Sequence, residues 1–383
     1  MINEDRIKHN LKEFSFPRLS GTQYELKAFN KLKQEVEELN LNFEVQSFTF
    51  SSFYSRIYPK IAFSSGSLLY LILYLNLNMI ISLILILILL SILIMSFIIT
   101  RSPEKIRLLP KFKSQNLLIK LKSESEDPTN TNRTVLFMSH LDSKGQRFTI
   151  RIRIRIIKLW IISSIILSII LPLKIVMFEI VFYIFGLFPL IMNVFASFML
   201  VLNTVNNTSQ GAVDNASGLT CNLELLHYYC NPKNRLINYN MWFLFTGAEE
   251  CGTMGIRHFY NNLENFDPEK SLIFNFESIA KHVYIFPGGS EGNHGKDVDN
   301  LLLNNTRNLK IVHFITNRVF GTHSDGGFLG NKGFQGYGFG EVESYDYMHT
   351  PNDTIDKIDT EILKKLCLVL TDSLKKHDLN YFK

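Results

Sequence analysis

The chain has 383 residues, of which 46% are hydrophobic and 20% charged, and its formal net charge at pH 7 is +5. This length suits one large α/β domain or two smaller ones. The four cysteines form no Cys-x-x-Cys pair, which disfavours a disulfide framework and a thiolate zinc site, so we expect reduced thiols. Residues 1–14 are largely polar, and we expect no cleavable signal peptide.

The N-terminal part is predicted to form an amphipathic helix over residues 21–39 and then a strand over residues 43–50. An apolar block follows over residues 61–100, which include no Asp, Glu, Lys or Arg. Because a bilayer core takes about 20 helical residues, we predict two membrane spans with a turn at Asn76 and Asn78. Buried core helices are the alternative, but such helices are usually shorter and amphipathic.

A basic stretch leads into a second apolar block. In residues 147–156, RFTIRIRIRI, isoleucine and arginine alternate, which predicts a strand. Its basic face would lie against lipid headgroups, or the strand would be a solvated ribbon. The second block covers residues 159–203 and is interrupted by Pro172, Lys174 and Glu179, so we predict a second transmembrane helical hairpin.

Basic residues gather at the flanks of both blocks. They are Arg56, Lys60, Arg101, Lys105, Arg107, Lys111, Lys113, Lys144, Arg147, Arg151, Arg153, Arg155 and Lys158. Within the hairpin turns the only basic residue is Lys174. The positive-inside rule therefore predicts that the flanks, and everything attached to them, lie in the cytoplasm. Nucleic-acid binding is a weaker interpretation because these charges adjoin apolar spans, and we expect no nucleic-acid partner.

Outside the two blocks, strand and helix patterns alternate. The further predicted elements are strands over residues 116–121, 134–139, 240–245 and 271–276, and helices over residues 217–229 and 360–376. This alternation predicts an α/β sandwich with a mixed, mostly parallel central sheet.

Charged side chains follow three of these strands. His140 and Asp142 come directly after the strand over residues 134–139. The next two strands run into Glu249 and Glu250 and into Glu277. Since ligands of open α/β sheets bind beyond the carboxyl ends of the strands, we expect these side chains to form one polar cluster.

Two loops add to this cluster. GAVDNASG offers Asp214 just before a helix, and YDYMHTPNDT offers His349. Histidines and carboxylates without thiols suit Zn²⁺ or a similar divalent ion, and Asp214 on its glycine-flanked loop is suited to bridge two ions. Asp142, two residues after His140, can accept the second ring N–H of that histidine and so fix its tautomer.

The adjacent pair Glu249 and Glu250 can divide two tasks, because neighbouring side chains point in different directions. One can bind metal while the other takes a proton from an activated water. A Glu-Glu pair alone is more often a solvated face, and His-x-Asp alone occurs often by chance. Their joint occurrence with the two loops, each at a strand end or a glycine-rich turn, carries the prediction.

The ordered motifs SHLDS, GAVDNASG, FTGAEECGTMGIRHF, NFES and YMHTPNDT resemble the M28 family of co-catalytic zinc metallopeptidases. The segment PRLSGTQYELKAFNKLKQEVEELNLNFEVQSF resembles the family's opening helix and strand. The resemblance covers about residues 12–50 and 115–375 apart from the second apolar block. It implies the three-layer α/β/α sandwich of zinc aminopeptidases, here interrupted by two transmembrane helical hairpins, and a peptide substrate.

The resemblance also implies two positions for Zn²⁺ or other divalent ions that share a bridging aspartate. The ligands would be His140, Asp214 and Glu277 at the first position and Asp214, Glu250 and His349 at the second. Glu249 would be the catalytic general base, supported by Asp142 beside His140. A cis peptide bond would join Asp214 to Asn215.

Some positions depart from the family's pattern. Position 277 is Glu where many secreted members have Asp, and membrane-spanning members resemble this chain there. Met348 stands where many members have a tyrosine that stabilises the oxyanion, which leaves Tyr345 and Tyr347 as candidates.

The substrate pocket is predicted from the segment THSDGGF. Ser324 and Asp325 resemble a Ser-Asp segment that lines the family's pocket. His323 precedes this pair rather than following it, so we interpret it as a pocket or structural residue and not as a ligand.

The predicted organisation is one peptidase domain interrupted twice. Residues 1–56, 106–146 and 205–383 would form this domain, residues 57–105 the first hairpin, and residues 147–204 the basic segment and second hairpin. Ligands precede and follow the second hairpin, so the chain must return to the side of the membrane that it left. We therefore expect an integral membrane protein with its catalytic domain on the cytoplasmic side.

The predicted function is that of a membrane-anchored di-zinc aminopeptidase whose partners are a peptide and the lipid bilayer. A glutaminyl cyclase on the same scaffold is one alternative, although cyclases keep one zinc and here both His140 and His349 accompany Asp214. A carboxypeptidase would need a basic pocket that the sequence does not locate. A non-catalytic membrane module is disfavoured because every ligand and Glu249 are present.

Overall fold

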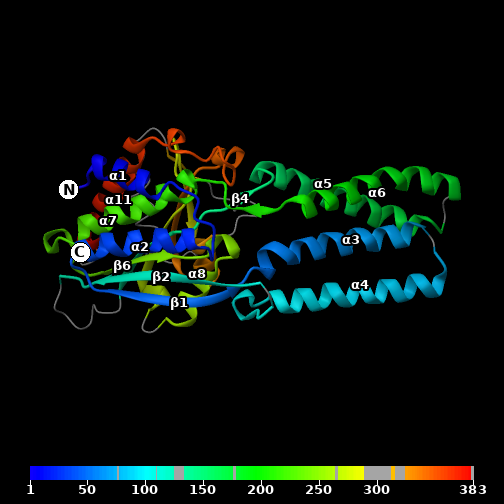
Figure 1. Cartoon of the computed structure of the whole chain (residues 1–383), viewed down its shortest axis with the longest axis horizontal. Coiled ribbons are helices and arrows are strands. Elements are labelled where there is room, and N and C mark those ends of the chain that lie inside the picture. The colour runs from blue at the N-terminus through cyan, green and yellow to red at the C-terminus, as the bar shows by residue number, and fades with distance from the viewer. Residues whose placement is uncertain are drawn as a thin grey trace. The chain divides into compact units, whose positions relative to one another are not determined.

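The computed structural model describes residues 1–75, 77–108, 110–124, 133–175, 178–263, 266–288, 312–314 and 324–380. The chain divides into two compact units (Figure 1). The sheet unit comprises Met1–Thr49, Phe112–Gly145 and Asn206–Lys383. The helical unit comprises Phe50–Lys111 and Gln146–Val205.

An eight-stranded sheet forms the centre of the sheet unit, in the order β1-β2-β6-β3-β7-β10-β8-β9. The strands are β1 Phe43–Ser51, β2 Lys111–Leu121, β3 Thr134–His140, β6 Asn240–Thr246, β7 Ser271–Phe276, β8 Val283–Gly288, β9 Val312–Phe314 and β10 Gln335–Gly340. The four neighbouring strands β6, β3, β7 and β10 are parallel, whereas β2 runs antiparallel to β6 and β8 antiparallel to β10. The predicted mixed sheet is therefore confirmed. Two short strands, β4 Gly145–Gln146 and β5 Val205–Asn206, form a separate sheet.

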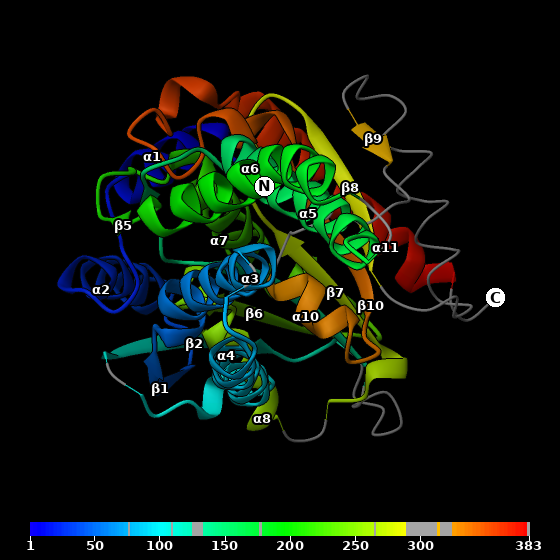
Figure 2. The same ribbon diagram turned by 90° about the vertical axis from the view of Figure 1, so that its right-hand side faces the viewer.

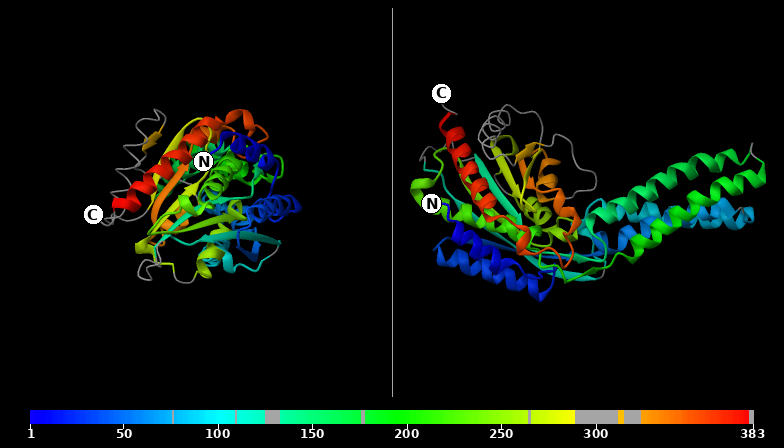
Figure 3. Two further views of the ribbon diagram at one scale, coloured as in Figure 1. Left: turned by 90° about the vertical axis from the view of Figure 1, so that its left-hand side faces the viewer. Right: turned by 90° about the horizontal axis from the view of Figure 1, so that it is seen from above.

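Helices cover both faces of the large sheet (Figure 3). They are α1 Glu4–Phe14, α2 Gln23–Glu38, α7 Gly218–Tyr229 and α11 Thr360–Asn380 in one core, and α8 Met254–Asn261 and α10 Asp325–Gly330 in the other. Strand β3 joins the two cores, because Val135 and Phe137 belong to the first and Leu136 and Met138 to the second. Successive side chains of a strand point to opposite faces, so a strand that is apolar throughout is buried on both. The predicted three-layer sandwich is confirmed.

The helical unit consists mainly of four long helices, which Figure 2 shows nearly end on. They are α3 Tyr58–Leu75, α4 Met79–Thr100, α5 Ile150–Leu173 and α6 Glu179–Leu202. Helix α5 packs on α6, and α3 packs on both α4 and α6. Within the described residues, α4, α5 and α6 are long and apolar enough to span a membrane. Helix α3 is shorter, with 18 residues, and it includes Pro59, Lys60 and three serines.

The turn predicted between α3 and α4 falls where a helix begins. The side chain of Asn78 accepts hydrogen bonds from the N–H of Ile80 at 3.0 Å and of Ile81 at 3.4 Å, which caps α4. Asn76, the other residue of the predicted turn, lies outside the described residues.

The strand predicted over residues 147–156 is wrong, because helix α5 begins at Ile150. Thr149 caps this helix, and its Oγ1 accepts the N–H of Ile152 at 3.2 Å. The Ile-Arg alternation leads directly into an apolar helix that continues to Leu173. A helix satisfies its backbone groups within the segment, whereas a strand here would need a partner strand. The helix therefore forms despite the local period-two pattern.

Candidate active site

The predicted side chains emerge at the carboxyl ends of the central parallel strands. His140 is the last residue of β3, and Glu277 directly follows β7. Glu249 and Glu250 begin a short turn after β6, Glu249–Cys251. Asp214 lies in the turn Ala212–Ser217 that precedes α7.

Asp214 lies between the two histidines. The Nε2 atom of His140 is 3.1 Å from Asp214 Oδ1, and the Nε2 atom of His349 is 2.9 Å from Asp214 Oδ2. The same His349 nitrogen is 2.7 Å from Glu250 Oε1. All four side chains are buried. The structure thus brings together His140, Asp214, Glu250 and His349.

The two other predicted acids act electrostatically on this group. Burial, with a smaller contribution from Asp214, raises the pKa of Glu277 to about 8 against the lowering effect of His140. Burial also raises the pKa of Glu249 well above its ordinary value, with Glu277 and Glu250 adding to the effect and His140 opposing it. Glu249 and Glu277 therefore belong to the same charged cluster.

Burial alone would raise the pKa of every acid in the cluster, but two of them are held ionised by their neighbours. Contacts with His140 and His349 lower the pKa of Asp214 below its ordinary range despite burial. Likewise, despite burial, the charges of His349 and Lys144 lower the pKa of Glu250 to about 2. The carboxylates of Asp214 and Glu250 therefore both face the imidazole of His349.

Asp142 supports both sides of the cluster. Its Oδ1 accepts the N–H of Glu249 at 3.0 Å, its Oδ2 accepts the N–H of Glu250 at 3.1 Å, and the hydroxyl of Ser20 donates to Oδ2. The Nδ1 atom of His140 lies 3.1 Å from the main-chain oxygen of Asp142 and 3.6 Å from its Oδ1. The nearer partner of the histidine is thus the carbonyl rather than the predicted carboxylate.

The turn at Asp214 is held by its neighbour. The peptide bond between Asp214 and Asn215 is cis, which confirms the prediction. The Asn215 side chain donates from Nδ2 to the main-chain oxygen of Phe276 at 2.8 Å and accepts the N–H of Gly218 at 3.0 Å. These bonds connect the Asp214 turn to the end of β7.

Two acids that support the backbone of the candidate site were not predicted from the sequence. Asp353 accepts the N–H of Val213 at 2.6 Å and of Asp214 at 3.3 Å. Glu25 Oε1 accepts the N–H of Ala248 at 2.9 Å. Asp353 had a signal, since it lies four residues after a candidate ligand in HTPND. Glu25 had none, because an acid in the first turn of a helix is ordinary.

Lys144 was counted among the basic residues that flank the second apolar block. In the structure its Nζ lies 2.6 Å from Glu250 Oε2, and its side chain is only 12% exposed. Its ammonium group therefore contacts a candidate metal ligand instead of lying in solvent.

The predicted pocket residues of the Ser-Asp segment begin α10. Ser324 accepts the N–H of Gly327 at 3.0 Å and caps this helix. Asp325 is buried and accepts a hydrogen bond from the hydroxyl of Thr246, at the end of β6. Burial raises the pKa of Asp325 to about 6. His323 lies outside the described residues.

The predicted pocket tyrosines belong to the chain segment that leads to His349. Tyr345 lies in the short helix Glu343–Asp346, Tyr347 follows it, and both are half-buried. Met348 is buried, with its sulfur 2.6 Å from the hydroxyl of Ser344. No described contact joins Tyr347 to a candidate ligand.

The donor set fits a divalent cation. Asp214, Glu250 and His349 each offer one ligand atom, and these atoms lie within 4.8 Å of one another. Among the described residues, Glu250 Oε1 is buried and makes no hydrogen bond. Buried anionic oxygens that converge need a cation between them, and a nitrogen and oxygen set suits Zn²⁺.

A second group of possible ligands combines two exposed side chains with a buried one and has another task. It consists of His282, Glu341 and Glu343. Glu341 Oε2 accepts the main-chain N–H groups of residues 280–282 at 2.7–3.1 Å, so this acid anchors a turn.

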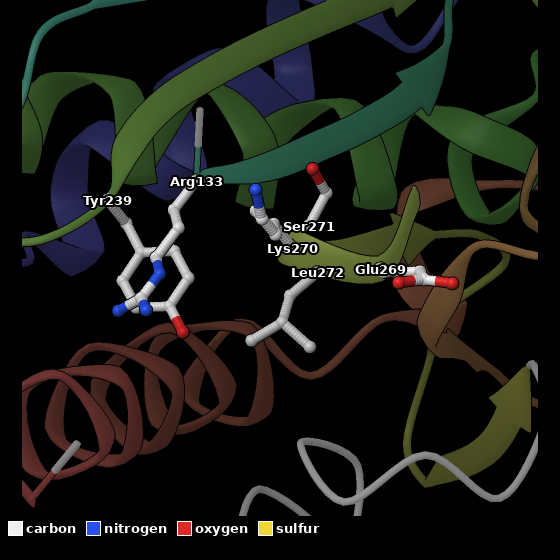
Figure 4. Close-up of a pocket in the computed structure, with 6 residues that line it drawn as sticks. All are labelled: Arg133, Tyr239, Glu269, Lys270, Ser271 and Leu272. Atoms are coloured by element: carbon white, nitrogen blue, oxygen red, sulfur yellow. The ribbon is translucent and has the colours of Figure 1, made fainter. Parts of the chain in front are cut away.

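A small pocket lies at the opposite, amino ends of the parallel strands (Figure 4). Its lining residues are Arg133, Tyr239, Glu269, Lys270, Ser271 and Leu272. These residues precede or begin β3, β6 and β7, so none of the candidate ligands lines this pocket.

Comparisons with known proteins agree with this geometry. The family model described as Peptidase family M28 matches residues 189–372, a range that contains Asp214, Glu249, Glu250, Glu277 and His349. No curated protein matches the chain in sequence.

Several solved structures share the fold. An aminopeptidase from Aneurinibacillus sp. strain AM-1 is similar with a TM-score of 0.58 at 14% identity, covering 98% of this chain and 94% of that one. A zinc aminopeptidase from Bacillus subtilis gives a TM-score of 0.54 at 12% identity, covering 98% and 95%. A glutaminyl cyclase from Fimbriiglobus ruber gives 0.53 at 14%, covering 98% and 95%. The family match covers residues 189–372, just under half of the chain, and together with the shared fold it agrees with the resemblance to peptidase family M28 and with a hydrolase.

Proposed function

We propose that this protein is a membrane-anchored aminopeptidase that uses two divalent ions, most naturally Zn²⁺. The observation that carries the proposal is the position of Asp214, whose two carboxylate oxygens face His140 and His349 separately. An aspartate with one oxygen toward each histidine suits a bridge between two metal positions. The proposed ligands are His140, Asp214 and Glu277 at the first position and Asp214, Glu250 and His349 at the second.

Two bound ions would polarise the scissile carbonyl and lower the pKa of water. Glu249 is the proposed general base, which takes a proton from the attacking water and later gives it to the leaving amine. Burial raises the pKa of Glu249, which makes its carboxylate a stronger proton acceptor than an ordinary one. Asp142 holds the backbone of Glu249 in place for this role and lies beside the ring of His140.

The substrate would lie beside the Ser-Asp segment and the tyrosines before His349. Asp325 is the pocket residue best supported, because it is buried and the charge of His140 acts on its carboxyl group. Ser324, Tyr345 and Tyr347 remain proposed lining residues.

The proposed arrangement in the cell is a catalytic domain on the cytoplasmic face of a membrane. The proposed domain comprises residues 1–56, 106–146 and 205–383. Residues 57–105 form the first membrane hairpin, and residues 147–204 form the basic segment and the second hairpin. Support comes from three helices that are long and apolar enough to span a bilayer and from the basic residues near their ends.

The test is the release of free amino acids from matched peptides by the detergent-purified, zinc-loaded protein. Each peptide is supplied with a free and with an N-acetylated amino terminus. An aminopeptidase releases amino acids only from the free peptides. Release from the C-terminus of both forms would instead indicate a carboxypeptidase, and no release from any peptide would refute peptidase activity.

Glutaminyl cyclase activity is the second candidate, because a cyclase shares the fold with a TM-score of 0.53, against 0.54 and 0.58 for the two aminopeptidases. Peptides that begin with glutamine distinguish the two. A cyclase releases ammonia and leaves the peptide intact, whereas an aminopeptidase releases glutamine.

A further inference from the structure

Lys144 binds a proposed metal ligand. Its Nζ lies 2.6 Å from Oε2 of Glu250, and the side chains of both residues are largely buried. The pair is held from the same segment of chain, since Asp142, two residues before the lysine, accepts the main-chain N–H of Glu250. An ammonium group in a buried site is a fixed charge that water screens only weakly.

The two oxygens of Glu250 therefore have different partners. Oε1 faces His349 at 2.7 Å, whereas Oε2 is occupied by Lys144. Only Oε1 remains for a cation, and the ammonium offsets much of the negative charge that would attract one.

Within the described part of the chain, no such cation pairs with Glu277, the outer carboxylate of the other proposed metal position. Glu277 Oε1 accepts its hydrogen bond from Asn275 Nδ2, a neutral amide, at 2.9 Å. Asp214 is common to both positions, so it does not distinguish them. The two outer glutamates do, because the amide beside Glu277 carries no charge, whereas the ammonium beside Glu250 repels a cation.

We propose that Lys144 weakens cation binding at the position between Glu250 and His349, so that the protein holds one ion tightly and a second one reversibly. This inference rests on the proposed two-metal site. Lys144 is then a residue that sets metal affinity and has no direct part in the reaction. Activity would depend on free zinc concentration through the second ion alone.

The test measures zinc binding to the metal-free, detergent-purified full chain by competition with a chelator of known affinity. The wild type is expected to bind two ions in two separate steps. Lys144→Met keeps the length of the side chain and removes its charge, and it should tighten the weaker step about tenfold or more while leaving the stronger step unchanged. Lys144→Arg should bind like the wild type.

Further variants make the result specific. Lys144→Gln keeps an N–H donor without a charge and should also tighten the weaker step, which preserves the test if Lys144→Met fails to fold. Lys120→Met removes an exposed lysine that pairs with Glu44, and it should leave both steps unchanged. Glu250→Gln should abolish the weaker step and so assign it.

The outcomes separate this inference from the proposed function. If two ions bind and the weaker step depends on Glu250, but the Lys144 variants leave it unchanged or weaken it, the role of Lys144 is refuted and the metal site stands. Equal affinity for both ions in the wild type would also refute it. If no zinc binds, or if Glu250→Gln has no effect on binding, both proposals fall.

Discussion

Asp353 acts on the site through the backbone. Its carboxylate accepts the N–H groups of Val213 and Asp214, which fixes the turn that carries the proposed bridging ligand. Asp353→Asn replaces one acceptor oxygen by a donor and should lower zinc affinity by about 10- to 100-fold, the usual effect of losing a group that orients a metal ligand. Chelator competition measures this. Asp356→Asn, at an exposed acid paired with Lys357, is the matched control and should have no effect. Unchanged affinity in Asp353→Asn would contradict this role.

His227 predicts a pH dependence of stability. Burial, aided by the charge of Arg6, lowers the pKa of His227 from 6.5 to about 4 in the folded protein. Below pH 6.5 the unfolded chain takes up a proton that the folded chain resists, so stability is full above pH 6.5 and falls as the pH drops toward 4. His227→Leu should flatten this slope in thermal unfolding of the detergent-solubilised protein. His9→Leu changes an exposed histidine and should keep the wild-type slope. A wild-type slope in His227→Leu would count against the assignment.

At the scale of single residues, sequence reasoning reached side chains with a motif around them and missed those without one. His140 and Glu277 could be predicted because each directly follows a predicted strand. Glu25 could not, since its contact with the turn at Ala248 joins residues 223 positions apart. Lys144 could not either, because a lysine beside an apolar block is ordinarily a solvated charge.

Among the elements, a buried polar side chain joins three helices of the helical unit. Asn193 of α6 accepts a hydrogen bond from Ser67 of α3 at 2.6 Å and donates to Ser163 and Ser164 of α5 at 3.1 and 2.8 Å. A polar group buried among apolar helices gains most from such partners, because lipid offers none.

Asn193→Leu should therefore destabilise the helical unit by about 1 kcal/mol, since three serine hydroxyls lose a partner. The measurement is the thermal unfolding midpoint in detergent. Ser91→Leu is the control, because this exposed serine, among the described residues, bonds only to Leu87 of its own helix. Equal midpoints for the two variants would show that the Asn193 bonds add nothing.

Local sequence patterns predicted some of these elements correctly and one of them wrongly. Buried strands such as β3 could be predicted because continuous apolar runs bounded by polar residues leave few alternatives. The alternation of isoleucine and arginine led to a wrong strand prediction. It covers only a few residues, and the much longer apolar segment that follows forms a helix that includes most of them. Over residues 150–173, the need to satisfy the backbone within one segment decides the outcome.

At the scale of the whole molecule, we predict that the sheet unit is accessible from the cytoplasmic side of the membrane. The sheet unit should be digested by protease in sealed vesicles that expose the cytoplasmic face and protected in vesicles of the opposite orientation. The reason is the excess of Lys and Arg near the ends of the apolar helices. Detergent-opened vesicles control for intrinsic resistance, and digestion only in the opposite orientation would overturn the predicted topology.

The most direct measurement compares peptide turnover by the wild type and Glu249→Gln, with both proteins brought to the same measured zinc content. Glutamine preserves the shape of the side chain and removes its ability to accept a proton. We predict that turnover falls by about 100-fold or more while zinc content and substrate binding stay unchanged. Wild-type turnover in Glu249→Gln at equal zinc content would contradict the claim that this chain is a metallopeptidase with Glu249 as its general base.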